Sequence, residues 1–218
     1  MKKISFLFLC FLSALFVQAQ NETKLRTDAE TKPRFGLKAG VNLAEFHASE
    51  RPAGWTNYNT NRKTTFYGGL LLNLPIGSVL AIQPELLYSG AGSKVAFTPT
   101  MGSRVSLEQD LSYLTLPVMI QLRSPSGFFA EIGPQLGYLL KAQNDGAAPY
   151  NGDIKDNLDK IDFAANGGIG YTSRVGLGVN ARYSWGLADI IDDNNSGGGK
   201  IRNRGIQIGL FYVLGAGQ

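Results

Sequence analysis

Cysteine is nearly missing from this chain, which has only Cys10, and that residue lies in an apolar segment at the N-terminus. Beyond this segment we therefore expect no disulfide and no cysteine-bound metal. Long hydrophobic runs are also missing, because after residue 19 no stretch reaches the eighteen apolar residues that suggest a transmembrane helix. Histidine is scarce too, with His47 alone.

The N-terminal segment has the features of an export signal. Lys2 and Lys3 precede the apolar residues 4–17, and Val17-Gln18-Ala19 places small residues where a signal peptidase cleaves. We predict a signal peptide over 1–19 and a polar periplasmic leader over 20–33. An N-terminal membrane helix is the alternative, although residues 4–17 are short for one.

Charge of one sign is not in large excess. The formal net charge is +4, and removing Lys2 and Lys3 leaves 4 − 2 = +2. The lysines and arginines form no basic stripe interleaved with aromatics, so we predict no nucleic-acid partner.

Glycine and aromatic residues are plentiful, with 27 glycines and 11% aromatics, a composition that suits a β-barrel. Residues 174–185 alternate apolar and polar side chains, as a strand with one oily face does. Similar alternation predicts eight strands, at 34–43, 64–74, 79–89, 111–122, 127–141, 160–172, 174–187 and 202–214.

The predicted connections alternate in length. Segments 44–63, 90–110, 142–159 and 188–201 are long, whereas 75–78, 123–126 and Ser173 are short. Long outer loops and short periplasmic turns are typical of outer-membrane barrels. We therefore predict an all-β fold, an eight-stranded antiparallel up-and-down transmembrane β-barrel over 34–214, with its first strand paired to its last.

Two arguments favour apolar side chains on the outside. An eight-stranded barrel has a narrow interior, which glycines and medium polar residues fill better than leucines do. The apolar-face aromatics also gather near strand ends, as lipid–water girdles require. One group is Phe35, Phe128, Tyr171 and Tyr212, and the other is Phe66, Tyr88, Tyr138, Phe163, Tyr183 and Trp185. The alternative is a soluble, lipocalin-like barrel with the leucines inside.

Three prolines conflict with the strand pattern. Pro84, Pro117 and Pro134 lie within predicted strands, where each removes a hydrogen-bond donor from the ladder. We expect a bulge or a strand end at each of them.

Four segments in order resemble one known family. They are FGLKAGVNLA (35–44), YLTLPVMI (113–120), AEIGPQLGYLL (130–140) and NARYSWGLADI (180–190). The chain is similar along 34–214 to the PorT-like outer-membrane β-barrel family, which implies a barrel in a Bacteroidota-type cell envelope. The family takes its name from a member linked to secretion and gliding, but no residue here carries that role by motif. The chain also lacks the terminal aromatic residue at which many such barrels end, since Tyr212 is followed by VLGAGQ.

Several groups of side chains are candidates for a chemical site. His47, near Glu45, Ser49 and Glu50, lies in a predicted loop that would not fix a catalytic base. Glu85 and Glu131 share the polar face with Lys38 and Arg182, so we predict an interior ionic network in which Arg182 pairs with a carboxylate, rather than an acid–base pair.

Two loop motifs fall short of a known site. Residues 192–197 (DDNNSG) begin like a calcium loop, yet Asn203 stands where its glutamate belongs. Asp153, Asp156 and Asp159 resemble solvated turn residues, and 197–200 (GGGK) lacks the phosphate-loop spacing. We therefore predict no catalytic, cofactor-binding or metal-binding residue and no cofactor.

The sequence thus favours a non-enzymatic outer-membrane barrel whose outer loops bind a partner or surface. A small pore is the first alternative, a barrel enzyme acting on lipid the second. The expected partners are outer-membrane lipid, the barrel-insertion machinery and an envelope or extracellular protein of unspecified identity.

Overall fold

The chain forms a closed antiparallel β-barrel. The computed structural model describes residues 32–50, 55–99, 104–146, 151–188 and 200–215. Its elements are β1 (Arg34–Glu50), β2 (Trp55–Ile76), β3 (Leu80–Pro99), β4 (Val105–Arg123), β5 (Phe128–Gly146), β6 (Gly152–Asp153), the 3₁₀ helix η1 (Lys155–Asn157), β7 (Ile161–Thr172), β8 (Leu177–Gly186) and β9 (Lys200–Val213). Among these described residues no helix is long and apolar enough to cross a membrane.

Eight long strands make the ring, as predicted. Each pairs with its neighbours in sequence order, β4 pairs with β5, and β1 pairs with β9 to close the barrel. The short strand β6 adds to β5 outside this ring, through Gln143↔Asp153 and Asn144↔Gly152. The predicted pairing of the first strand with the last is therefore confirmed.

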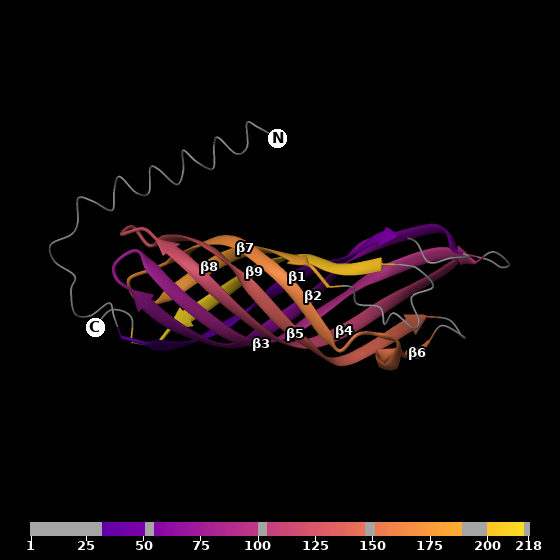
Figure 1. Ribbon diagram of the computed structural model, residues 1–218, viewed down its shortest axis with the longest axis horizontal. Coiled ribbons are helices and arrows are strands. Elements are labelled where there is room, and N and C mark those ends of the chain that lie inside the picture. The colour runs from indigo at the N-terminus through magenta and orange to yellow at the C-terminus, as the bar shows by residue number, and fades with distance from the viewer. Residues whose placement is uncertain (1–31, 51–54, 100–103, 147–150, 189–199, 216–218) are drawn as a thin grey trace, which may run out of the picture.

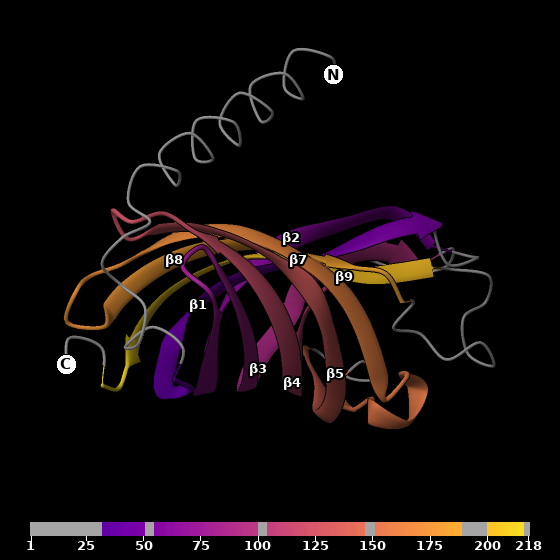
Figure 2. The same ribbon diagram turned by 60° about the vertical axis from the view of Figure 1, so that its left-hand side comes forward.

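The two ends of the barrel differ, and we name them the turn end and the extension end. Three short turns, 77–79, 124–127 and 173–176, lie at the turn end together with the start of β1 and the end of β9 (Figures 1 and 2). At the extension end, hairpins project beyond the rest of the barrel, and β6 and η1 lie there as well (Figure 1).

The reversal after β7 is longer than Ser173 alone. The N–H of Ser173 donates to the carbonyl of Leu177 at 2.8 Å, and the N–H of Gly176 donates to that of Ser173 at 3.0 Å. Gly176 has φ 89°, a conformation that glycine adopts without strain. Residues 174–176 therefore belong to the turn, and the strand predicted over 174–187 runs from Leu177 to Gly186.

Two of the four predicted long loops, 44–63 and 90–110, are mostly strand in the described residues, contrary to expectation. β2 has 22 residues, whereas a tilted strand crosses a bilayer in about 9–11. Residues 45–50 continue β1 along β9, and residues 55–62 continue β2 along β3. Residues 90–97 and 105–110 extend the β3–β4 ladder, and residues 142–146 continue β5 along β4. The hydrophobic alternation ended earlier because it reports only the lipid-facing portion, while backbone pairing continues beyond it.

The prolines are absorbed without bulges or strand ends, contrary to expectation. In β3–β4, Pro84 pairs with Val118 and Leu87 with Thr115, so the register is the same on both sides of the gap in pairing. In β4–β5 the same holds between Pro117↔Gln135 and Ile120↔Ile132. The ladder therefore loses individual pairings at the prolines but keeps its register.

Side chains segregate as the sequence predicted. Leu116, Leu177 and Ile208 face outward with 44%, 54% and 52% of their surface exposed, whereas Glu131 and Arg182 are buried. All ten girdle aromatics predicted above are exposed. The strand pairing places Phe35, Phe128, Tyr171 and Tyr212 towards the turn end and the other six towards the extension end. The lipocalin-like alternative is therefore wrong: the bore is polar at its centre, and the oily surface points away from it.

Candidate functional site

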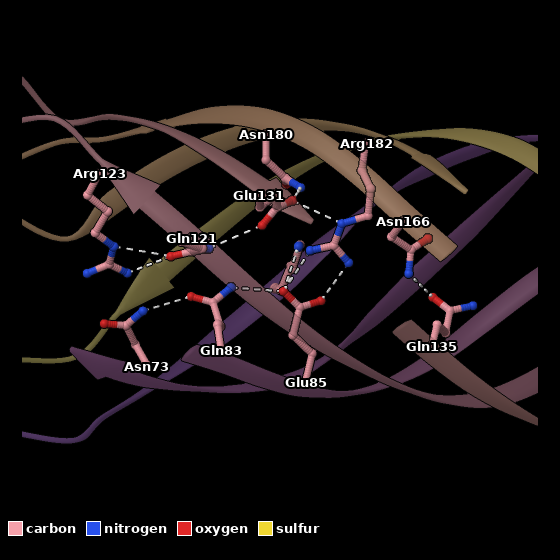
Figure 3. Close-up of polar contacts among 11 residues, drawn as sticks. Asn73, Gln83, Glu85, Gln121, Arg123, Glu131, Gln135, Asn166, Asn180 and Arg182 are labelled. Atoms are coloured by element: carbon pink, nitrogen blue, oxygen red, sulfur yellow. Dashed lines mark hydrogen bonds and ion pairs between the residues drawn. The ribbon is translucent and has the colours of Figure 1, made fainter. Parts of the chain in front are cut away.

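Four charged side chains meet at the centre of the bore, and we call them the ionic quartet: Lys38 of β1, Glu85 of β3, Glu131 of β5 and Arg182 of β8. Lys38 Nζ lies 3.0 Å from Glu85 Oε1. Arg182 donates from Nη1 and Nη2 to the two oxygens of Glu85, each at 3.0 Å, and from Nε to Glu131 Oε1 at 3.0 Å. Figure 3 shows Glu85, Glu131 and Arg182 pointing toward one another.

Amide side chains complete the network around the quartet. Gln83 Nε2 donates to Glu85 Oε1 at 2.8 Å, and Gln121 Nε2 donates to Glu131 Oε2 at 3.1 Å (Figure 3). Asn180 Nδ2 donates to Glu131 Oε1 at 3.3 Å. Every carboxylate oxygen of Glu85 and Glu131 thus accepts at least one hydrogen bond, which offsets the cost of burying their charge.

The quartet is electrically neutral, since two cations face two carboxylates. All four residues are buried, and a buried charge without a partner is expensive. The predicted ionic network, with Arg182 as its centre, is confirmed. The sequence placed these four residues on one face, but the bridging of Glu85 and Glu131 by one guanidinium depends on strand register, which the sequence did not reveal.

Towards the turn end, four buried apolar side chains form a cluster that we call the apolar plug: Leu71, Phe129, Phe211 and Val213. The rings of Phe129 and Phe211 lie 6.0 Å apart, edge to face. A Cβ on Gly170 would collide with the Phe129 ring, and one on Gly178 with the Phe211 ring, so these glycines make room for the plug. The sequence did not predict the plug, although its four residues are apolar side chains on the strand face that is otherwise polar.

A small vestibule of about 60 Å³, lined by both polar and apolar residues, lies on the extension side of the quartet. Asn42, Asp162 and Gln207 line it, and each keeps a buried oxygen that has no hydrogen-bond partner among the described residues. Asn203 Nδ2 donates to Asp162 Oδ2 at 2.9 Å, so the residue at the glutamate position of the calcium-loop motif serves the bore instead. A space of this size holds a few waters, which would satisfy the free oxygens.

The extension has an apolar core of its own. Val95, Phe97, Leu107, Leu111, Tyr113, Leu139 and Ala142 are buried together, and Ile154 and Leu158 beside η1 pack against them. Sequence reasoning treated most of these residues as loop. The missed signal was short-range alternation, because Val95, Phe97, Val105 and Leu107 each follow the period of two that a strand requires.

Outside the bore, the extension carries an ion cluster of Lys63, Lys94, Glu108 and Asp110. Lys63 Nζ lies 3.0 Å from Glu108 Oε2 and 2.7 Å from Asp110 Oδ1, and Lys94 Nζ lies 2.7 Å from Glu108 Oε1. The hydrogen bond from Lys94, then that from Lys63, lowers the pKa of Glu108. Burial opposes the charge of Lys63, but the hydrogen bonds to Asp110 and Glu108 prevail and raise its pKa.

The remaining sequence candidates do not come together. His47 lies on β1 opposite Arg202, not in a loop as expected, because β1 continues past the apolar segment. Residues 192–197 lie outside the described residues. Asp153 is exposed in β6, and its Oδ1 accepts from the N–H of Lys155 at 2.8 Å, which is a turn interaction. Within the described part of the chain, no cluster of three or more His, Cys, Asp or Glu is suited to hold a metal.

Comparison with known proteins agrees with this geometry. The profile of one protein family, described as outer membrane protein beta-barrel domain, matches residues 18–192. No curated protein matches the chain in sequence.

Two solved structures show the likeness of fold. Neisserial surface protein A (NspA) is 11% identical, with a TM-score of 0.50 over 82% of this chain and 96% of its own. The outer membrane protein OprG from Pseudomonas aeruginosa is 12% identical, with a TM-score of 0.50 over 87% and 99%.

Proposed function

Since the chain belongs to the outer membrane protein beta-barrel domain family, we propose that it is a non-conducting, non-enzymatic barrel that holds a structured recognition surface outside the cell. It is an outer-membrane β-barrel protein.

The observation that carries the proposal is the apolar core of the extension. A bare loop needs no buried core, yet Val95 and Phe97 are almost completely buried beyond the lipid-facing belt. Burying such side chains holds β3, β4, β5 and η1 in one arrangement. Ordering these residues costs conformational entropy, which an unstructured loop would not lose. A fixed surface binds a partner with less ordering cost than a flexible loop does.

The orientation follows the rule for this class of barrel. Short turns face the periplasm and long hairpins face the outside. We therefore assign the turn end to the periplasm and the extension to the exterior. Residues 1–19 as a removed signal peptide and 20–33 as a periplasmic leader complete this arrangement and remain part of the proposal. The PorT-like label, resting on the four motifs above, belongs to it as well.

The bore supports a non-conducting role. From the turn end, an ion would first meet the apolar plug of Leu71, Phe129, Phe211 and Val213 and then the neutral quartet. Eight-stranded barrels have room for their side chains and little else. The alternative of a small pore would require both barriers to move.

Conductance in planar bilayers tests this part of the proposal. We expect no steady channel from the wild-type protein. The positive control is a triple variant that removes both barriers, Phe129→Ala, Phe211→Ala and Arg182→Ala. It is used if its mobility shift on a semi-native gel shows that the barrel still folds. Steady unitary current through the wild-type protein would favour the pore.

The recognition role is tested on intact envelopes. A photo-crosslinker placed at exposed Lys94 on the extension should capture one specific envelope or extracellular protein, whereas the same probe at exposed Ser126 in a periplasmic turn should not. No specific product at Lys94 and at further extension positions would contradict recognition at this surface. A lipid hydrolysis and acyl-transfer assay, with His47→Ala as control, addresses the enzyme alternative, and turnover lost in that variant would favour it.

A further inference from the structure

A groove of about 230 Å³ opens on the outer wall of the barrel, across β1, β2, β8 and β9. It shares Arg204 and Gly205 with the lining of the vestibule, but none of its lining residues belongs to the ionic quartet, the apolar plug or the extension core. Its lining includes Leu43, Glu45, Arg62, Tyr183, Arg204 and Ile206. It therefore combines two guanidinium groups with an apolar wall, on a surface that the proposed function does not use.

The charges in the groove are unbalanced. Arg62 Nε donates to Glu45 Oε2 at 3.1 Å, and Arg204 lies directly opposite Glu45 in the β1–β9 ladder. Two arginines thus share one carboxylate. Arg204 Nε is buried and has no hydrogen-bond partner in the part of the chain that the structure describes. The described lining of the groove therefore carries two cations and one carboxylate, a formal excess of one positive charge.

The groove lies at the depth of the lipid–water interface. Tyr183, which lines it, and Trp185 belong to the outer aromatic belt, and belts of this kind mark the headgroup level. Arg204 holds its guanidinium carbon 5.6 Å from the Trp185 ring centroid, which fixes the cation at that level. Ile206, two residues further along β9, begins the apolar surface that acyl chains would contact.

We propose that this groove binds the phosphate of an anionic lipid in the outer leaflet. A guanidinium presents paired donors that match a phosphate, and its charge is not lost at any physiological pH. The apolar wall of Leu43, Tyr183 and Ile206 lies beside the arginines, where the lipid's glycerol or sugar and acyl region would lie. That wall is why the ligand is a lipid phosphate rather than a free anion.

Tryptophan quenching tests the assignment, because Trp185 stands beside the groove. The protein, as a Trp55→Phe variant with Trp185 as its remaining tryptophan, is reconstituted in phosphatidylcholine vesicles. Either phosphatidic acid or phosphatidylcholine with brominated acyl chains is then titrated in. We expect phosphatidic acid to occupy the site beside Trp185 roughly fivefold more tightly, the effect of about one interfacial charge.

Matched variants separate this site from general surface charge. Arg204→Gln and Arg62→Gln should each bring the preference close to one, while Lys160→Gln should keep it. Lys160 is exposed at the same end of the barrel but does not line the groove. Equal quenching by the two lipids, or a preference that survives both arginine variants, would overturn the proposal.

A second arm distinguishes lipid phosphate from free phosphate. A large excess of inorganic phosphate at constant ionic strength should leave the lipid preference in place. If inorganic phosphate abolishes it, the groove is a general anion site and the lipid assignment is wrong. Neither arm depends on recognition by the extension, so the two proposals fail independently.

Discussion

At the scale of single residues, Arg182 determines the state of the bore. Its three donor nitrogens reach Glu85 on β3, across the ring, and Glu131 on β5, which is separated from β8 by β7 alone. Alternation along the sequence was sufficient to place Lys38, Glu85, Glu131 and Arg182 inside. It was not sufficient to pair them, because pairing across a barrel depends on strand register and tilt.

Removing this guanidinium should be costly. Arg182→Ala leaves two buried carboxylates facing one lysine, and losing one partner of a buried ion pair destabilises by about 3–5 kcal/mol. We expect a large fall in the urea midpoint of unfolding in detergent micelles. Arg174→Ala, in an exposed turn, should leave the midpoint almost unchanged.

A double variant separates lost charge balance from lost packing. Arg182→Met with Glu131→Gln restores neutrality around the Lys38–Glu85 pair and should recover part of the stability. If Arg182→Ala leaves the midpoint where it was, the quartet is not structural.

The ion cluster of the extension should respond to acid. The pKa of Glu108 is lowered in the folded protein, so its contribution is present above its unfolded pKa of about 4.3 and is lost as pH falls through the lower folded value. Glu108→Gln should therefore reduce the stability of the extension slightly near neutral pH. The contribution is small because these side chains are partly exposed.

Hydrogen exchange of the β3–β4 hairpin at several pH values measures this difference. We expect the wild type and Glu108→Gln to differ at pH 7 and to converge below about pH 4. A difference that grows on acidification would have the wrong sign for a lowered pKa.

At the scale of elements, the sequence located the strands but misjudged their ends. The lipid-facing portions were predicted closely, since alternation is strongest where one side meets lipid and the other a polar bore. The hairpins of the extension were missed because neither face there needs to be continuously apolar. Their ladder is visible only in the structure, as in Lys94↔Glu108 and Asp110↔Gln143.

The extension should lose its order without loss of the barrel when its core is weakened. Phe97→Ala removes an almost completely buried ring, and such deletions cost about 3–5 kcal/mol. Limited proteolysis of intact cells should then cut the extension of this variant faster, while the barrel stays folded by its shift on a semi-native gel. Ser106→Ala, on the exposed surface of β4 and outside the ion cluster, is the control. Unchanged cleavage would mean that the buried cluster does not hold the hairpins together.

At the scale of the whole molecule, the rest of the arrangement follows from which face of each strand points outward. Because the outer surface is apolar, the charged side chains of the membrane-spanning strands lie in the bore, where they must neutralise one another. The apolar outer surface does not itself close the two ends of the bore. The sequence predicted the choice of faces and the closure of β1 on β9. It did not predict the apolar plug, because Phe129 and Phe211 are inward exceptions to the pattern on their strands.

Spin-label accessibility tests the choice of faces most directly. In a Cys10→Ser background, nitroxides are attached one at a time to Leu116→Cys, Leu177→Cys and Ile208→Cys in lipid vesicles. We expect all three labels to collide readily with oxygen, which concentrates in lipid, and rarely with a water-soluble nickel chelate. Labels at these positions that are shielded from oxygen, or that collide freely with the nickel chelate, would contradict a lipid-facing outer surface.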